Sequence, residues 1–535
     1  MHHRMRPRSP LFRNWLTTLT AMLLLTSTQL AVGGPVRIES GLIEGEVLDA
    51  DANLRVYRGV PYAAPPVGDL RWKSPQTVIG WDDVRPAIEF GPACPQPNSL
   101  ALMLRQPMPN TSEDCLYLNV WTAAESPDAK LPVMVWIHGG GLNLGWSHQS
   151  EYDGTAFAKQ GVVLVSINYR LGPSDICPSG TFQGVGSRSF GQLWVPRSDR
   201  RPAVGAEERE AFGGDPGNVT IFGESAGGTS VVVLGATPLA KGLFHRMIAQ
   251  SPWVTETNFA HLREPSPHVD SAEALGTKWI ASAVDGGEDD LLSTMRGLSA
   301  DQLVAKMRNN YPVVVTVDGW FLPDTADAIF TRGLQNDVPL IIGTNADEGT
   351  MFQALLPYKT AEDFQAQIRA FYGEHADDVL QQYPVSSAND LSAAVNAYIG
   401  DTWFVRGTRN VLRGMEKASS PAFQYYFTRK SPVLPNWGAH HAAELRYVFR
   451  TLDHESHGDT DRKLSDAMIG YWVQFAKTGD PNVDGLPDWP TYESSTDQYL
   501  ELGKEIRVGT ALRKDACDVL ERVRSSEQRL SASGN

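Results

Sequence analysis

The sequence predicts a fold of the α/β class, supported above all by a strand, a sharp turn and a helix in direct succession. Residues 219–222 are apolar and β-branched, a short turn of small residues follows, and a second apolar run occupies residues 231–234. Residues 116–121 and 132–137 also read as strands, and the apolar run at 162–168 is typical of a strand buried on both faces. We therefore expect a mostly parallel central sheet flanked by helices.

The turn reads Gly223-Glu224-Ser225-Ala226-Gly227, which is a G-x-S-x-G sequence. Such a turn needs residues without bulk beside the serine, because the backbone doubles back under strain and lifts the hydroxyl clear of the sheet. Ser225 is therefore the candidate nucleophile. A serine hydroxyl is hardly ionised near neutral pH, so the chain must also supply a base, an orienting acid and donors for an oxyanion.

The strand at 132–137 ends in His138-Gly139-Gly140-Gly141. Backbone N–H groups that no side chain covers can point at a developing oxyanion. A glycine triplet by itself is more often a flexible turn. Because HGGG upstream of G-x-S-x-G is the arrangement of oxyanion loop and nucleophile in lipases and esterases, we favour the catalytic interpretation.

Length and composition suit a large globular protein. The chain has 535 residues, of which 42% are apolar, and this argues against disorder. Its formal net charge of −15 argues against nucleic acid and against anionic membrane surfaces as partners.

The N-terminus resembles a targeting segment. Four arginines within the first 13 residues precede an apolar stretch at 15–25 and small residues at 31–33. This order predicts a secretory signal peptide over residues 1–33, whose apolar part is too short to span a bilayer; a disordered cytoplasmic leader is the alternative. No other segment reads as a membrane span. Because of the signal peptide we expect an exported protein, secreted or periplasmic. The polar residues 526–535 are expected to form a loose tail.

The chain contains four cysteines, at positions 94, 115, 177 and 517. In an exported protein Cys94 and Cys115 can close a disulfide loop, although spacing alone does not determine the pairing. A reduced pair in a cytosolic chain is the alternative. Nearby, residues 36–60 alternate apolar and polar side chains, which predicts a small N-terminal antiparallel sheet before a proline-rich connector at 61–68.

Several long motifs give the chain a family resemblance. They are YRGVPYAAPPVGDLRW from Tyr57, EDCLYLNVW from Glu113, VMVWIHGGG from Val133, FGGDPGNVTIFGESAGG from Phe212, VPLIIGTNADEG from Val338 and FAKTGDPN from Phe475. The sequence resembles the type-B carboxylesterases, the cholinesterase-like branch of the α/β-hydrolase fold. The resemblance implies one α/β-hydrolase domain over residues 34–525 that hydrolyses small-molecule carboxylic esters through an acyl-enzyme, with neither cofactor nor metal.

The resemblance also implies an acid and a base downstream of the serine. The acid falls on Glu348, with Asp347 as a local rival that we expect to face solvent. The base falls on His441, with His440 as the alternative one position away. From the residues alone, His440 and Glu444 could lie one helical turn apart like metal ligands, but no third ligand at a credible spacing accompanies them.

By the same resemblance, Gly140, Gly141 and Ala226 donate the oxyanion-hole N–H groups. Glu224 and Ser251 match positions that support the triad in relatives, although ordinary buried polar packing is an equal alternative.

Other family features concern packing and specificity. Relatives pair the residues that match Arg58 and Glu113 in a structural salt bridge. The loop between Cys94 and Cys115 lacks the tryptophan that relatives use to hold a quaternary ammonium group, which disfavours a cholinesterase. Trp253 and Phe259 are candidates for lining the acyl or alcohol pocket, with core packing as the alternative.

The resemblance is lost after Gly172 and returns at Ala211. Codons can be chosen for residues 189–209 that, read from the second base, give ASGNYGFLDQIAALQWVRKN, which is the missing family text. We therefore hypothesise two compensating frame errors over residues 173–210, in which case Cys177 is an artefact and Cys517 is the one unpaired thiol. Two alternatives to an active esterase remain. The first is a catalytically inactive binding protein, since some members of the family that the chain resembles are adhesion modules, and the second is a product disabled by the frame error.

Overall fold

The computed structural model describes residues 34–174, 211–283, 291–307, 311–356 and 358–533. The predicted signal peptide at 1–33 and residues 175–210 of the divergent stretch, with Cys177, lie outside the described residues.

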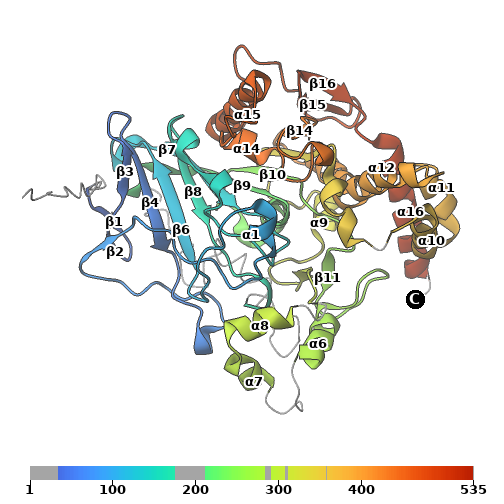
Figure 1. Ribbon diagram of the computed structural model, residues 1–535, viewed down its shortest axis with the longest axis horizontal. Helices are drawn as coiled ribbons and strands as arrows, with labels where there is room; N and C mark the ends of the chain where they lie inside the picture. The colour runs from blue at the N-terminus through green and yellow to red at the C-terminus, as the bar shows by residue number, and fades with distance from the viewer. Residues whose placement is uncertain (1–33, 175–210, 284–290, 308–310, 357, 534–535) are drawn as a thin grey trace, which may run out of the picture.

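An eleven-stranded sheet forms the centre of the molecule (Figure 1). From one edge to the other its strands are β16 (Ile506–Thr510), β15 (Gln498–Leu502), β14 (Ala422–Phe427), β13 (Leu340–Asn345), β10 (Arg246–Gln250), β9 (Gly214–Glu224), β7 (Leu131–Ile137), β8 (Val163–Ile167), β6 (Tyr117–Thr122), β4 (Leu54–Pro61) and β3 (Glu46–Asp49). The strands from β15 to β8 are parallel, and those beyond them at both edges are antiparallel. This confirms the predicted fold class and the buried strands.

The sheet has an apolar core on each face. Along β7, Val133, Val135 and Ile137 enter one core, whereas Met134 and Trp136 enter the other, because side chains alternate across a strand. The first core is completed by α5 (Ala226–Ala236), α9 (Ala326–Arg332) and α13 (Arg406–Met415), and the second by α2 (Thr155–Ala158), α14 (Leu445–Val448) and α15 (Asp459–Thr478). The central strands are thus fixed from both sides.

The other helices pack in smaller groups. A third apolar cluster joins α10 (Ala361–Tyr372), α11 (Ala376–Leu380), α12 (Ala388–Ile399) and α16 (Lys514–Ser533), and a fourth joins α6 (Ala272–Ala283), α7 (Leu291–Gly297) and α8 (Ala300–Lys306); α1 (Ser99–Leu104) packs separately. The tail that we expected to be loose differs from the expectation, because α16 continues to Ser533. No glycine or proline interrupts the sequence before Gly534, so nothing ends the helix earlier.

The small N-terminal sheet is present but differs in detail from the prediction. It contains β1 (Val36–Ile38), β2 (Gly41–Glu44) and β5 (Val84–Pro86), and β2 pairs antiparallel with β1 but parallel with β5. The later part of the alternating segment, β3 and β4, instead extends the large sheet. A separate pair of parallel strands is formed by β11 (Phe259–His261) and β12 (Val315–Val317).

One expected salt bridge is wrong. The carboxylate of Glu113 pairs with Arg71, whose Nε lies 2.6 Å from Glu113 Oε1, and Arg58 pairs with Glu46 instead. The reason is that Arg71 is buried, with three backbone carbonyls around its Nη1 atom, and its guanidinium plane can bind the carboxylate at two points. Arg58 on β4 meets Glu46 from the adjacent strand β3.

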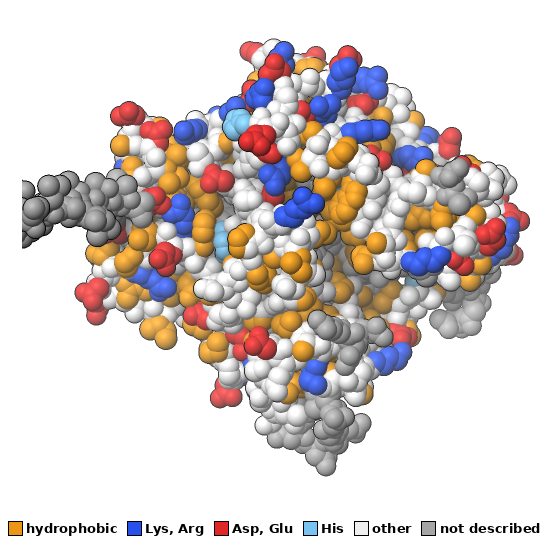
Figure 2. All heavy atoms as spheres, viewed as in Figure 1, with side chains coloured by type: hydrophobic (Ala, Val, Ile, Leu, Met, Phe, Trp, Pro, Cys, Tyr) orange, Lys and Arg blue, Asp and Glu red, His pale blue; other side chains and the backbone are white. Residues whose placement is uncertain are grey.

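Figure 2 shows acidic and basic side chains interspersed over one face of the molecule, with no broad basic patch on its described part. Within the described residues, no helix has both the length and the hydropathy needed to cross a membrane.

Cys94 and Cys115 form a disulfide, as predicted, and Cys517 is a buried free thiol. The bond closes a loop with a sequence separation of 21 residues. We expect the double substitution Cys94→Ala/Cys115→Ala to lower the free energy of unfolding by about 3 kcal/mol, because the bond restricts the unfolded chain. Urea denaturation of the oxidised protein and of the variant measures this, and an unchanged midpoint would contradict it.

Candidate active site

Ser225 lies at the sharp turn between β9 and α5. Its φ of 57° and ψ of −120° are a conformation that residues with side chains rarely adopt. Its N–H donates to the Gln250 carbonyl at 2.9 Å, and Ala226 begins the helix. A Cβ at Gly227 would lie 1.9 Å from the carbonyl oxygen of Ile137, so only glycine fits where the helix approaches β7. The neighbouring chain therefore holds Ser225 in its strained conformation.

The glycine loop after β7 lies directly beside this turn. A Cβ at Gly139 would be 3.1 Å from the Ser225 Cβ. Gly140 has a φ of 114°, and a Cβ there would lie 2.1 Å from the Leu144 carbonyl oxygen. Among the described residues, neither the Gly140 nor the Gly141 N–H has an acceptor. The N–H groups of Gly140 and Gly141 are thus without an acceptor in the part of the chain that the structure describes, and they belong to a loop whose first glycine lies beside Ser225.

A buried carboxylate holds the imidazole of His441. His441 Nδ1 lies 2.6 Å from Glu348 Oε2, and Glu348 is fully buried. Its other oxygen, Oε1, accepts the Ser251 hydroxyl at 2.6 Å and the Asn345 N–H at 2.7 Å. These donors prevent the carboxylate from rotating, so it presents Oε2 to the imidazole. Ser251, which the sequence left undecided, therefore contacts the acid.

A second carboxylate lies on the other side of the ring. Glu224, the residue before Ser225, places Oε1 3.1 Å from His441 Nε2. Burial raises the pKa of Glu224 to about 8. Burial alone would lower the pKa of His441, but the charges of Glu224 and Glu348 outweigh it and raise this pKa to about 9. Nε2 makes no hydrogen bond with any described residue, Ser225 included.

The neighbouring candidates have other partners. His440 turns its Nδ1 to the carbonyl of His441, at 2.7 Å. Asp347, expected to face solvent, is half-buried and accepts the Ala439 N–H at 2.8 Å and the Asn396 side-chain amide at 3.1 Å. The structure therefore brings Glu348 and His441 together, and Asp347 holds the histidine loop.

Glu444 belongs to a buried polar network that the sequence did not reveal. Its oxygens accept the side-chain amides of Gln250 at 3.0 Å and Asn345 at 2.6 Å. Burial raises its pKa. Because His440 turns to a backbone carbonyl instead, the two residues do not form the metal pair considered above. Asn345 is the link between this network and Glu348, and its only sequence signal is its place in the NADEG motif.

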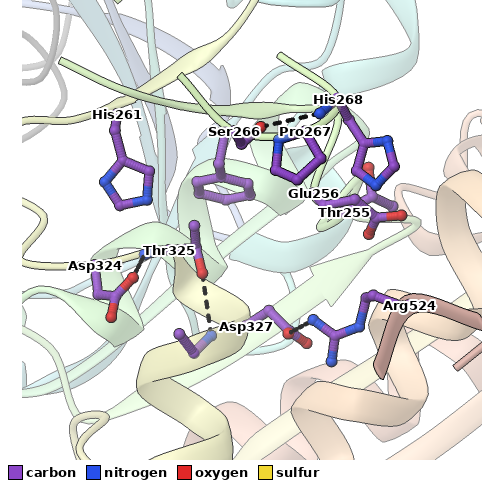
Figure 3. A pocket seen from close by; sticks show the side chains of 12 residues that line it. Thr255, Glu256, His261, Ser266, Pro267, His268, Asp324, Thr325, Asp327 and Arg524 are labelled. Carbon is purple, nitrogen blue, oxygen red and sulfur yellow. Dashed lines mark hydrogen bonds and ion pairs between the residues drawn. The ribbon is translucent and has the colours of Figure 1, made fainter. Parts of the chain in front are cut away.

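The two aromatic residues proposed for the substrate pocket differ. Trp253 is half-buried and stacks on Trp403 with ring centroids 4.9 Å apart. Phe259 is buried in the core and lines a cavity of about 230 Å³, which lies beside the ion pair of Asp327 and Arg524 (Figure 3). Of these two residues, only Trp253 is connected to His441, through Trp403 and Phe352.

Comparison with known proteins is consistent with this geometry. Residues 34–184 and 206–520 match the family described as "Carboxylesterase family". The chain is 32% identical over 508 residues to the fumonisin B1 esterase of Sphingopyxis macrogoltabida, covering 89% of this chain and 87% of that protein. It is 34% identical over 472 residues to the para-nitrobenzyl esterase of Bacillus subtilis, covering 84% and 92% respectively. The matched ranges leave out residues 185–205, within the divergent stretch.

The fold of this chain is also similar to that of solved esterase structures. A PNB esterase structure matches with a TM-score of 0.75 at 30% identity, covering 90% of this chain and 99% of that chain. A thermophilic PNB esterase matches with a TM-score of 0.76, also at 30% identity and with the same coverage. This chain therefore belongs to the carboxylesterase family and is a carboxylic-ester hydrolase of the α/β-hydrolase fold.

Proposed function

We propose that Ser225, His441 and Glu348 form a catalytic triad that cleaves small-molecule carboxylic esters through an acyl-enzyme. Ser225 attacks the ester carbonyl while His441 Nε2 takes its proton, and Glu348 stabilises the imidazolium. His441 then gives the proton to the leaving alcohol. Water, activated by the same imidazole, attacks the acyl-enzyme and releases the acid and free Ser225.

The N–H groups of Gly140, Gly141 and Ala226 stabilise the oxyanion in this proposal. A donor of this kind typically contributes about 3 kcal/mol to the transition state. Ala226 is the first residue of α5, where an N–H has no partner inside the helix.

One observation carries the proposal: the hydrogen bond between His441 and the fully buried Glu348, whose second oxygen is already occupied. This arrangement favours the tautomer with the proton on Nδ1, which leaves Nε2 able to accept one. Nε2 is turned toward Glu224, the chain neighbour of Ser225. In unliganded enzymes, hydrogen bonds to the nucleophile are often long and tighten only with substrate.

Labelling tests the proposal directly. We expect a fluorophosphonate probe to modify the protein once, on the peptide that contains Ser225. The fraction of p-nitrophenyl acetate turnover that is lost should equal the fraction of protein that is labelled. Peptide mass spectrometry measures the extent of labelling, and the colour of released nitrophenol measures the rate of turnover. Turnover without label on Ser225 would refute the triad, and absence of both would favour an inactive binding protein or a disabled product.

We also propose that the protein is exported and loses residues 1–33. The Cys94–Cys115 disulfide supports this, because such bonds persist in oxidising compartments. The N-terminal sequence of the protein recovered outside the cytoplasm would begin near residue 34.

Glu224→Gln is expected to shift the acid limb of the pH profile of kcat/KM to lower pH. The base must be neutral, so activity rises as the pH passes the pKa of His441, which the adjacent carboxylates hold at about 9. Removing one negative charge destabilises the imidazolium and should lower this pKa by roughly one unit. Rates from about pH 5 to 10 measure the shift. An unmoved limb would show that Glu224 has no electrostatic effect on His441.

A further inference from the structure

The helix that passes His441 contains an irregular turn. Between α12 and α13, residues Gly400–Val405 form a π-helix. Such wide turns are rare and occur often at functional sites. This one carries two consecutive aromatic residues, Trp403 and Phe404.

Buried ion pairs on both flanks of the two aromatic residues fix the π-helical turn. Asp401, which is buried, binds the Arg513 guanidinium at 2.5 Å and the Tyr383 hydroxyl at 2.9 Å. Arg406, at the first position after the turn, pairs with Glu256. Removing these partners would leave buried charges unpaired, so the turn is held firmly in place.

The turn sets Phe404 beside the imidazole and Trp403 one ring further away. The Phe404 and His441 ring centroids are 4.9 Å apart, and those of Phe352 and His441 are 5.1 Å apart. Trp403 lies 5.2 Å from Phe352 and stacks on Trp253 at 4.9 Å. The rings form a continuous series that ends at His441.

The other end of the series is tied to the nucleophile. Thr229 bridges the two: its hydroxyl donates to the Ser225 carbonyl at 3.1 Å, and the Trp253 N–H donates to that hydroxyl at 2.9 Å. Trp253 Nε1 donates to Thr255, which fixes the indole. Phe404 is buried, whereas Trp253, Phe352 and Trp403 are each partly exposed. The partly exposed rings therefore belong to the series that connects the chain beside Ser225 with His441.

We propose that Trp403, together with Trp253 and Phe352, forms an aromatic subsite that selects esters carrying an aromatic ring. The inference rests on the proposed triad, since it takes the reacting carbonyl to lie between Ser225 and His441. Aromatic rings attract one another in offset or edge-to-face geometry beyond the effect of buried area. A ring next to the ester group can pack on Trp403 while the carbonyl reaches Ser225.

Three esters test the subsite: phenyl acetate, with the ring on the alcohol, ethyl benzoate, with the ring on the acid, and ethyl acetate. We expect Trp403→Ala to lower kcat/KM about five-fold or more for at least one of the aromatic esters, and less than about two-fold for ethyl acetate. The ester that loses rate identifies the half of the substrate that occupies the subsite. Trp403→Phe should keep most of the rate. Trp320→Ala, at an exposed indole, is the matched control and should change none of the three.

Equal losses on all three esters, or no loss on either aromatic ester, would overturn the subsite. A wild-type protein that hydrolyses none of them would overturn the proposed triad instead. Binding to the subsite can be tested without turnover in Ser225→Ala. In this variant we expect phenyl acetate or ethyl benzoate to quench tryptophan fluorescence, and to do so at a lower concentration than ethyl acetate needs for any change in fluorescence. The difference should disappear when Trp403→Ala is added. If Trp403→Ala fails to fold, this comparison of ligands in Ser225→Ala decides, and equal responses to all three refute the subsite.

Discussion

Ser225→Ala is expected to reduce kcat for p-nitrophenyl acetate by at least about 10⁴-fold, while the protein stays folded. The substitution removes the only hydroxyl at the strained turn and leaves no atom to form the acyl-enzyme. Alanine is smaller than serine, so it adds no clash at this turn. Initial rates, with the thermal unfolding curve as a check on the fold, measure the outcome.

Ser230→Ala is the matched control, because Ser230 lies on α5, the helix that Ser225 precedes, and among the described residues its hydroxyl bonds only the Ala226 carbonyl, at 2.6 Å. We expect it to change kcat by no more than a few-fold. Equal rates for wild type and Ser225→Ala would remove Ser225 from the mechanism.

Glu348→Gln is expected to reduce kcat by roughly 10³- to 10⁴-fold. Ser251 and the Asn345 N–H both donate to Oε1, so the amide oxygen of a glutamine must take that position. Its NH₂ group then faces His441 Nδ1, which must lose its proton to accept it. The proton moves to Nε2, and the imidazole can no longer act as a base.

The adjacent substitution Asp347→Asn makes the same chemical change one residue away and separates the two carboxylates. An asparagine oxygen can still accept the Ala439 N–H, so we expect less than about a ten-fold loss. If Asp347→Asn were the more damaging of the two, the acid would be assigned wrongly.

Much of the fold could be predicted from local sequence. The strands at 116–121, 132–137 and 162–168 are confirmed because strands buried on both faces are mostly apolar, and such runs can be recognised from the local sequence. The strand, turn and helix around Ser225 are confirmed for the same reason, together with the glycines that the turn requires. The predictions were wrong where the partners of an interaction lie far apart along the sequence. Examples are the pairing of β2 with β5 in the small sheet and the salt bridge between Glu113 and Arg71.

Trp403 had no signal in the sequence. Its position depends on a π-helical turn, and that turn depends on buried ion pairs with residues as distant as Arg513. Neither apolar periodicity nor a motif encodes such contacts.

By itself the sequence determined the fold class, the strained serine turn and the glycine loop, because each rests on local residue types or on long family motifs. The family motifs pointed to Glu348 and His441, but only the tertiary structure decided that these two side chains meet, that Glu224 contacts the same ring, and that Trp403 belongs to the series of rings that reaches it. Adjacent carboxylates and adjacent imidazoles have the same chemistry, so nothing in their composition distinguishes them. The direction in which each side chain points is set by the strand or loop that carries it and by the donors it meets from distant parts of the chain.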